Sequence, residues 1–265
     1  MEQAELNASR DRFREVIYRT HPDETGKIVP SFHRRLRAEA ISSMVEVEKR
    51  RWSEEEVSTL PPRRYVHFPD GDFSELVIGD RIGVAGATDR QDMTRTRWDG
   101  SNLSRAAFFN VRLDGINLNN TIAPGLMVDS PSARFASFDG MRAPDSRWGY
   151  YREEGTALMV EDSNFRSATL RGATLENTFF IRCNFEGTDL RGIRGWDLFF
   201  KECDFTKAEL GANPDWSWIV LQRCLLTEEQ AASILLPPVC TVEPGTEGGT
   251  VLVRFDPSLL EAAEP

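Results

Sequence analysis

The chain has 265 residues and carries 32 Lys and Arg against 42 Asp and Glu, a formal net charge of −10. No stretch approaches the roughly 20 consecutive apolar residues of a membrane-spanning helix, and we expect no secretory signal sequence. Four cysteines without paired spacing are typical of a reducing compartment, so we expect a cytoplasmic protein. The net negative charge, without a patch rich in Lys and Arg, argues against direct nucleic-acid binding.

Residues 1–62 have helical rather than five-residue periodicity. A first helix is expected after Ser9, a longer one from about Ser31 to Arg51, and a third short turn at Ser53. The apolar face of the long helix would consist of Leu36, Ile41, Met44 and Val45. This N-terminal helical segment either caps the open end of the next domain or acts as a partner-binding or dimerising module.

A five-residue repeat dominates the middle of the chain. A large apolar residue recurs at every fifth position, and the residue two before it is usually small, as in Ala168-Thr169-Leu170. Because a period of five fits neither an α-helix nor a flat strand, it indicates a repeat architecture. Residues two apart in an extended segment point the same way, so the small and large residues face inward and the middle one faces water. The pattern predicts a coiled β-solenoid stabilised by stacking of neighbouring coils.

The repeat occurs in two runs with different phases. The earlier run extends from Met93 to Leu118 and can be traced back to about Val66, although residues 81–90 fit it badly. The later run, from Phe165 to Leu210, lies two residues out of phase with it. An insertion near residues 149–157 would account for the shift.

These pentads resemble the pentapeptide-repeat family, whose consensus is A-(D/N)-L-x-x. The resemblance implies a mainly β fold, a right-handed quadrilateral β-helix with twenty residues per turn, here over residues 63–226. Two internal spacings agree with it. Cys183 and Cys203 lie twenty residues apart at small inward positions, and Phe165, Phe185 and Phe205 are spaced to form one interior stack.

Residues 227–265 predict a small C-terminal α/β cap. Thr227 and Gln230 form a capping-box pattern before a helix that Pro237 would end. Two strands, Val239–Val242 and Thr250–Phe255, then form a hairpin across a Gly-rich turn. A helix beside an exposed edge is also a common dimer surface, so a homodimer through a terminal cap is a second interpretation.

No arrangement of residues in the sequence predicts catalysis. The histidines His21, His33 and His67 all lie outside the clear repeats and form no spaced set with a nucleophile. Cys183 and Cys203 occupy inward positions, where cysteine behaves as a small apolar residue. We therefore expect no enzymatic activity, no cofactor and no metal site.

Two groups of residues are candidates for binding a protein partner. The first lies in the insertion, since loops on a rigid scaffold often carry binding residues, and it consists of Tyr150, Tyr151, Arg152, Glu153 and Glu154. The alternative for it is an insertion folded back onto the coil. The second group contains Trp196 and Phe199. The register places Phe199 outward and Trp196 at a corner, but a local rearrangement that buries them is the favoured interpretation.

Two functions follow from these features. The first is a rigid, non-enzymatic scaffold or interaction module that binds a protein partner. The second is implied by the resemblance to topoisomerase-protecting members of the family, and is a DNA mimic that binds and protects or inhibits DNA gyrase. Residues 63–226 contain 20 basic and 23 acidic side chains. Mimicry of a polyanion would therefore require the acidic side chains to segregate onto one face.

Overall fold

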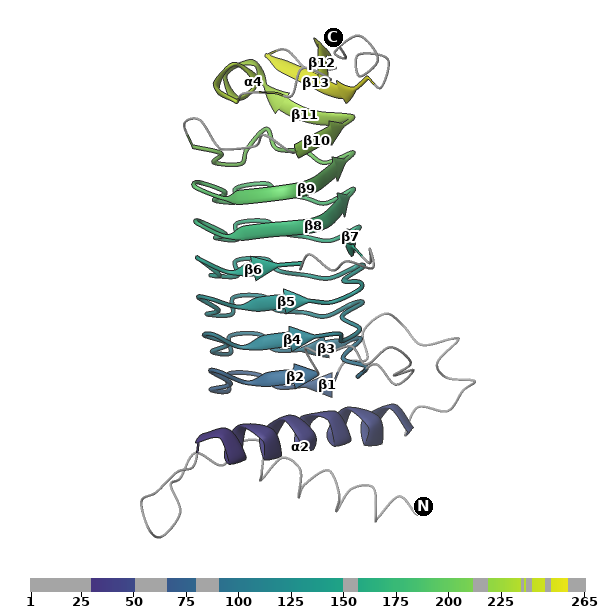
Figure 1. Ribbon diagram of the computed structural model, residues 1–265, viewed down its shortest axis with the longest axis vertical. Helices are drawn as coiled ribbons and strands as arrows, with labels where there is room; N and C mark the ends of the chain where they lie inside the picture. Colours follow the sequence, from purple (N-terminus) through teal and green to yellow (C-terminus); the bar gives the residue numbers. More distant parts are fainter. Residues whose placement is uncertain are drawn as a thin grey trace, which may run out of the picture.

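The computed structural model describes residues 30–50, 66–79, 91–149, 157–211, 219–234, 236, 240–245 and 249–256. It is a vertical stack of coils between helix α2 (Pro30–Arg50) at one end and a small antiparallel sheet at the other (Figure 1). The mainly β solenoid predicted from the pentads is confirmed. The expected helix after Ser9 and the turn at Ser53 lie outside the described residues.

Most strands of the coils are short and pair in parallel. One eight-stranded sheet has the order β10-β9-β8-β6-β5-β4-β2, with β7 also paired to β8, while β1 pairs with β3. The bounds of these strands are β1 (Val66–His67), β2 (Val77–Gly79), β3 (Thr96–Arg97), β4 (Ala107–Phe109), β5 (Met127–Asp129), β6 (Arg147–Trp148), β7 (Leu158–Glu161), β8 (Thr174–Ile181), β9 (Arg194–Lys201) and β10 (Ile219–Gln222).

Four parallel ladders define four sides of the coil, which we name after one residue of each: the Asn164, Thr169, Thr174 and Phe179 sides. Successive rungs are usually twenty residues apart, as in Asn164, Asn184 and Asp204. The last step, from Asp204 to Leu225, is one residue longer, and two earlier steps are much longer, because Asp72 pairs with Asn102 and Ser137 pairs with Asn164. A step of 30 keeps the five-residue phase and a step of 27 shifts it by two residues. The second step therefore explains the phase change in the sequence.

The interior consists of stacked side chains from successive coils. Phe138, Phe165, Phe185 and Phe205 form one column, with ring centroids 4.6, 5.1 and 5.0 Å apart and nearly parallel planes. Phe180 and Phe200 stack in a second column at 4.9 Å. All of these rings are buried. The predicted stack of Phe165, Phe185 and Phe205 is confirmed.

Helix α2 lies across the first coils (Figure 1). Ile41, Met44 and Val45 are buried in the same core as the coil interior, as the sequence predicted for these three residues. In the last turn of the helix, Lys49 Nζ contacts Asp92 Oδ2 at 2.7 Å and donates to Thr94 Oγ1 at 2.9 Å. Burial lowers the pKa of Lys49, although its hydrogen bond with Asp92 opposes the effect. The helix covers the interior at this end, as a cap does.

The C-terminal end is closed by helix α4 (Glu228–Ser233) and by strands β11 (Cys224–Thr227), β12 (Cys240–Pro244) and β13 (Thr250–Phe255). Both contacts of the predicted capping box between Thr227 and Gln230 are present. The Gln230 amide also donates to the backbone carbonyls of Phe205 and Ala208, which fixes the cap to the last coil. The helix was expected to continue to Pro237, which is wrong, because the backbone of Ile234 is already extended.

No helix in the described ranges has the length and apolar character needed to span a lipid bilayer.

The interior columns make a quantitative prediction about stability. Phe185→Ala should lower the free energy of unfolding by about 3–5 kcal/mol, because it leaves a cavity between two stacked rings. Phe199→Ala removes the same atoms from a half-buried, outward position and should cost clearly less. Urea unfolding followed by far-UV circular dichroism measures both, and equal losses would contradict the assignment of inward and outward positions.

Candidate functional surface

Strands β8 and β9 each turn a corner of the coil. Asn177 and Asp197 have φ values of 43° and 54° in the left-handed region, which Asn and Asp tolerate better than most residues. The first part of each strand therefore lies on the Thr174 side and the last part on the Phe179 side. Glu176 pairs with Trp196 immediately before this corner, and Phe179 pairs with Phe199 immediately after it.

Apolar side chains gather on the outside of this corner. On the Phe179 side they occupy consecutive rungs of one ladder, and the rings of Phe179 and Phe199 are 5.4 Å apart. Trp196 stands beside them with 39% of its surface exposed. We call this set the corner patch; it consists of Met159, Phe179, Trp196, Phe199 and Val220.

We expected a local rearrangement that buries Trp196 and Phe199. This expectation is wrong for Trp196, which is exposed, whereas Phe199 is half-buried and faces outward. The physical reason is an exchange of large and small residues at inward positions. Gly195 takes the place that Leu175 fills one coil earlier, and Leu198 fills the space from the next side. A Cβ on Gly195 would lie 2.3 Å from Leu198 Cδ1. The core is thus completed without either aromatic residue.

The insertion leaves the coil at the same corner. Gly149 has a φ of 74°, and a Cβ there would lie 1.8 Å from the backbone oxygen of Glu176. The chain re-enters at β7, whose Leu158 pairs with Thr178. Tyr150, Tyr151, Arg152, Glu153 and Glu154 themselves lie outside the described residues. Their two flanks nevertheless adjoin β8, one coil from Trp196 and Phe199.

A partly buried ion pair lies on the coil next to Trp196. Glu176 is only 1% exposed, and Arg147 Nη2 donates to its two carboxylate oxygens at 2.8 and 3.0 Å. Because Glu176 is the ladder partner of Trp196, this pair supports the corner from the neighbouring coil. Hydrogen bonds to charged groups are stronger than neutral ones, which favours a well-defined corner.

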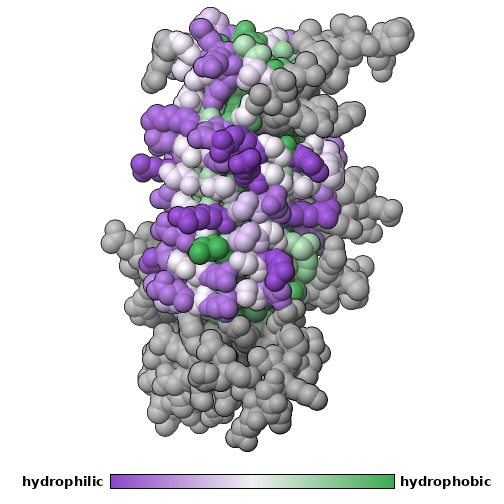
Figure 2. Space-filling model, turned by 90° about the vertical axis from the view of Figure 1, so that its left-hand side faces the viewer, coloured by the Kyte–Doolittle hydropathy of each residue, from purple (hydrophilic) through white to green (hydrophobic). Residues whose placement is uncertain are grey.

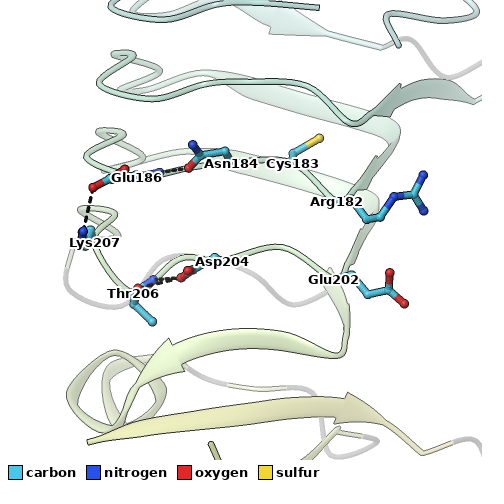
Figure 3. Close-up of a pocket in the computed structure, with 8 residues that line it drawn as sticks. All are labelled: Arg182, Cys183, Asn184, Glu186, Glu202, Asp204, Thr206 and Lys207. Carbon is cyan, nitrogen blue, oxygen red and sulfur yellow. Dashed lines mark hydrogen bonds and ion pairs between the residues drawn. The ribbon is translucent and has the colours of Figure 1, made fainter. Parts of the chain in front are cut away.

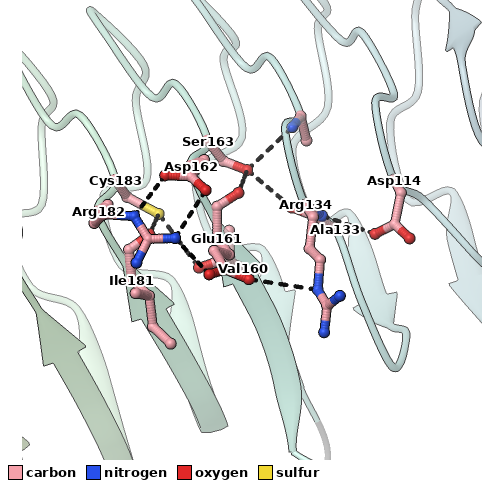
Figure 4. A network of polar contacts seen from close by, with 11 residues as sticks. Asp114, Ala133, Arg134, Val160, Glu161, Asp162, Ser163, Ile181, Arg182 and Cys183 are labelled. Atoms are coloured by element: carbon pink, nitrogen blue, oxygen red, sulfur yellow. Dashed lines mark hydrogen bonds and ion pairs between the residues drawn. The ribbon is translucent and has the colours of Figure 1, made fainter.

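Exposed charges on the other sides and corners are extensively paired. Arg182 binds Asp162 at 2.7 Å and Glu161 at 2.5 Å, and Arg134 approaches the same Glu161 at 3.5 Å (Figure 4). The hydrogen bonds from Arg182 lower the pKa of Asp162. Arg191 likewise contacts Asp189 at 2.8 Å. The left-hand face of Figure 1 is mainly hydrophilic with isolated apolar residues (Figure 2).

A groove of about 390 Å³ lies on the Asn164 side between two coils. Arg182 and Glu202 form one wall, Glu186 and Lys207 form the other, and Asn184 and Asp204 lie between them (Figure 3). Lys207 binds Glu186 at 2.7 Å and lowers the pKa of that carboxyl group. Asp204 Oδ1 accepts hydrogen bonds from the backbone and hydroxyl of Thr206. The groove is therefore satisfied internally and presents no activated nucleophile.

The cysteines form an interior column rather than a reactive site. Cys183, Cys203 and Cys224 are buried on successive coils. Burial raises the pKa of Cys203, and the hydrogen bond with Cys203 together with burial raises that of Cys224. Protonated thiols are poor nucleophiles and poor metal ligands. Within the part of the chain that the structure describes, no three His, Cys, Asp or Glu side chains are grouped to hold a metal ion.

Sequence reasoning found Trp196 and Phe199 but missed Phe179 and Met159. The signal for Phe179 was available, because it precedes Phe199 by twenty residues at the same outward position of its pentad. Met159 could not be placed in this way, since the insertion before it hides the register.

Comparison with protein families identifies the repeat. The family model described as pentapeptide repeats (8 copies) matches residues 161–194. Residues 161–194 of this chain are thus pentapeptide repeats, as the sequence predicted. None of the curated proteins matches its sequence.

Several solved structures are similar to this chain. QnrB1, a plasmid-mediated fluoroquinolone resistance protein, is 14% identical in its full-length form, with a TM-score of 0.31 over 65% of this chain and 91% of that one. Rfr23 from the cyanobacterium Cyanothece 51142 is 18% identical, with a TM-score of 0.19 over 52% and 84%. HetL from Nostoc sp. strain PCC 7120, a protein involved in heterocyst differentiation regulation, is 11% identical, with a TM-score of 0.17 over 64% and 85%.

The raised pKa values of the column cysteines predict chemical inertness. In the native protein at pH 8, iodoacetamide should leave Cys203 and Cys224 unmodified, whereas Cys240, which is only half-buried, should react first. The same treatment in urea should alkylate all four cysteines and serves as the control. Mass spectrometry of tryptic peptides reports the result, and rapid native alkylation of Cys203 would contradict the interior assignment.

Proposed function

We propose that this protein is a non-enzymatic scaffold that binds a protein partner through the corner patch. The observation that carries the proposal is the column of outward apolar side chains on consecutive coils, with the exposed Trp196 beside it. Aromatic side chains contribute much of the binding energy of protein interfaces. The side chains of Tyr150, Tyr151, Arg152, Glu153 and Glu154 would extend the patch from the adjoining insertion.

The rigidity of the coil supports a scaffold role. Phe179 and Phe199 are held by a parallel ladder on a core of stacked rings, so they are pre-organised before any partner arrives. Pre-organisation lowers the entropic cost of association. Apolar side chains gathered on one corner, rather than scattered, are also typical of interaction sites.

A non-enzymatic role agrees with the chemistry of the described side chains. The groove on the Asn164 side is lined by ion pairs and turn hydrogen bonds, and its cysteine faces the core. An activated nucleophile needs a neighbouring base or a depressed pKa. The pKa values of Cys203 and Cys224 are shifted in the opposite direction.

The DNA-mimic alternative has less support from the surface. A polyanion mimic needs a sustained negative stripe. Here the carboxylates of Glu75, Asp162, Glu186, Asp189 and Glu202 each lie within 4 Å of an arginine or lysine nitrogen. A cytoplasmic location and a homodimer through a terminal cap stay predictions.

The scaffold proposal is tested by substituting outward residues of the patch. Capture of a partner by photo-crosslinking from position 179 should fall at least about tenfold in the double variant Trp196→Thr, Phe199→Thr, because hot-spot aromatics contribute more than about 1 kcal/mol each. Tyr150→Ala with Tyr151→Ala should weaken the same complex by a similar factor if the insertion contributes.

The matched control is Ile122→Thr, an exposed apolar residue on the Thr169 side. It should leave capture unchanged, and circular dichroism should verify that all variants keep the native fold. Equal capture by the wild type and the Trp196 and Phe199 variant would overturn the proposal.

The alternative is tested with a gyrase supercoiling assay, with and without a fluoroquinolone. Because many of the acidic side chains are paired with Arg or Lys, we expect neither inhibition nor protection at micromolar protein concentrations. Clear protection at these concentrations would instead favour the DNA-mimic function.

A further inference from the structure

We infer that the partner of the corner patch presents an acidic amphipathic helix. This inference rests on the proposed function and concerns the chemistry of the segment that docks there. It is carried by the charges around the patch and by the spacing of its rungs.

Two cations flank the aromatic residues of β9. Arg194 precedes Trp196 by two residues and Lys201 follows Phe199 by two, so each cation shares a face with its aromatic neighbour. Neither makes an ion pair with an acidic side chain of the described residues, and Asp197, exposed at the corner between them, bonds to neither. Elsewhere on the described coils Arg182, Arg191 and Lys207 are paired with carboxylates, whereas Arg142 and Arg171 are not.

The ladder neighbours that the structure describes for these cations carry no charge. Lys201 lies between Ile181 and Gln222 on adjacent coils, and Arg194 pairs with Thr174 on the preceding coil. Along the same ladder, the next cation, Arg147, is neutralised by Glu176. Two positive charges thus lie beside the exposed Trp196 without an acidic partner among the described residues. Carboxylates on a partner would complement them and speed association, since complementary charges steer encounters.

The spacing of the patch favours a helix as the docked element. Met159, Phe179, Phe199 and Val220 occupy four consecutive rungs, which at about 4.8 Å per step span about 14 Å. On a helix, apolar residues three or four positions apart recur at about 5.3 Å, close to this step. Same-side residues of an extended strand recur at about 6.8 Å and lose register within two steps.

The experiment uses two synthetic helical peptides with identical leucines at positions i, i+3, i+4 and i+7. One carries glutamates beside the leucine stripe and the other carries lysines at the same positions. Fluorescence anisotropy with the full chain should give at least tenfold tighter binding for the acidic peptide at low ionic strength. The double variant Arg194→Glu, Lys201→Glu should abolish or reverse this preference.

A matched charge control is Arg142→Glu with Arg171→Glu, which makes the same change of charge at exposed positions away from the patch. It should keep the preference for the acidic peptide. Equal affinity for the two peptides, or no binding of the acidic one up to millimolar concentration, would overturn the inference.

The Trp196→Thr, Phe199→Thr variant distinguishes a wrong charge preference from a wrong docking surface. If both peptides need these aromatics but are not distinguished by charge, only the acidic partner is wrong. If the acidic peptide binds this variant as tightly as the wild type, the corner patch is not the docking surface and the proposed function fails with it.

Discussion

The vertical stacking of one coil on the next is the interaction on which the rest of this structure depends. A single coil cannot bury its interior, so Phe165 depends for its stacking on the rings of Phe138 and Phe185 in the two neighbouring coils. The parallel backbone ladders repeat with the same step as the interior rings, so outward side chains are also stacked from coil to coil. Outward residues twenty positions apart are consequently neighbours, and this is how Phe179 meets Phe199.

The two long steps of the ladders differ in their consequences. The extra residues between Asp72 and Asn102 amount to two whole pentads, so the chain returns to its original phase. Those between Ser137 and Asn164 do not, and the chain returns two residues out of phase. Gly149 permits the departure, because no Cβ fits against the backbone oxygen of Glu176. The second insertion is thereby placed beside the corner patch rather than beside another side.

Some exposed charges on this surface form ion pairs, and others do not. Over most of the coils, acidic and basic residues alternate between neighbouring rungs or turns, as for Glu186 and Lys207, and they neutralise one another. Exposed pairs of this kind contribute little stability, but they remove any long-range field of one sign. At the corner patch, Arg194 and Lys201 have no such partner among the described residues, as is also the case for Arg142 and Arg171 elsewhere on the coils. What distinguishes Arg194 and Lys201 is their position beside Trp196 and Phe199 on β9, which is why we propose this corner as a surface for a partner.

The sequence by itself determined which side chains face the interior of the solenoid. The pentad spacing was sufficient to predict the solenoid, the stack of Phe165, Phe185 and Phe205, and the phase shift, because inward residues obey one strict period. The helix over residues 30–50 and the capping box at Thr227 were also predictable, since helical periodicity and capping are local. The exposure of Trp196 was not, because it depends on Leu198 filling the space above Gly195. Only the tertiary structure decided which outward side chains become neighbours and which charges remain uncompensated, since these contacts join different coils and no local pattern encodes them.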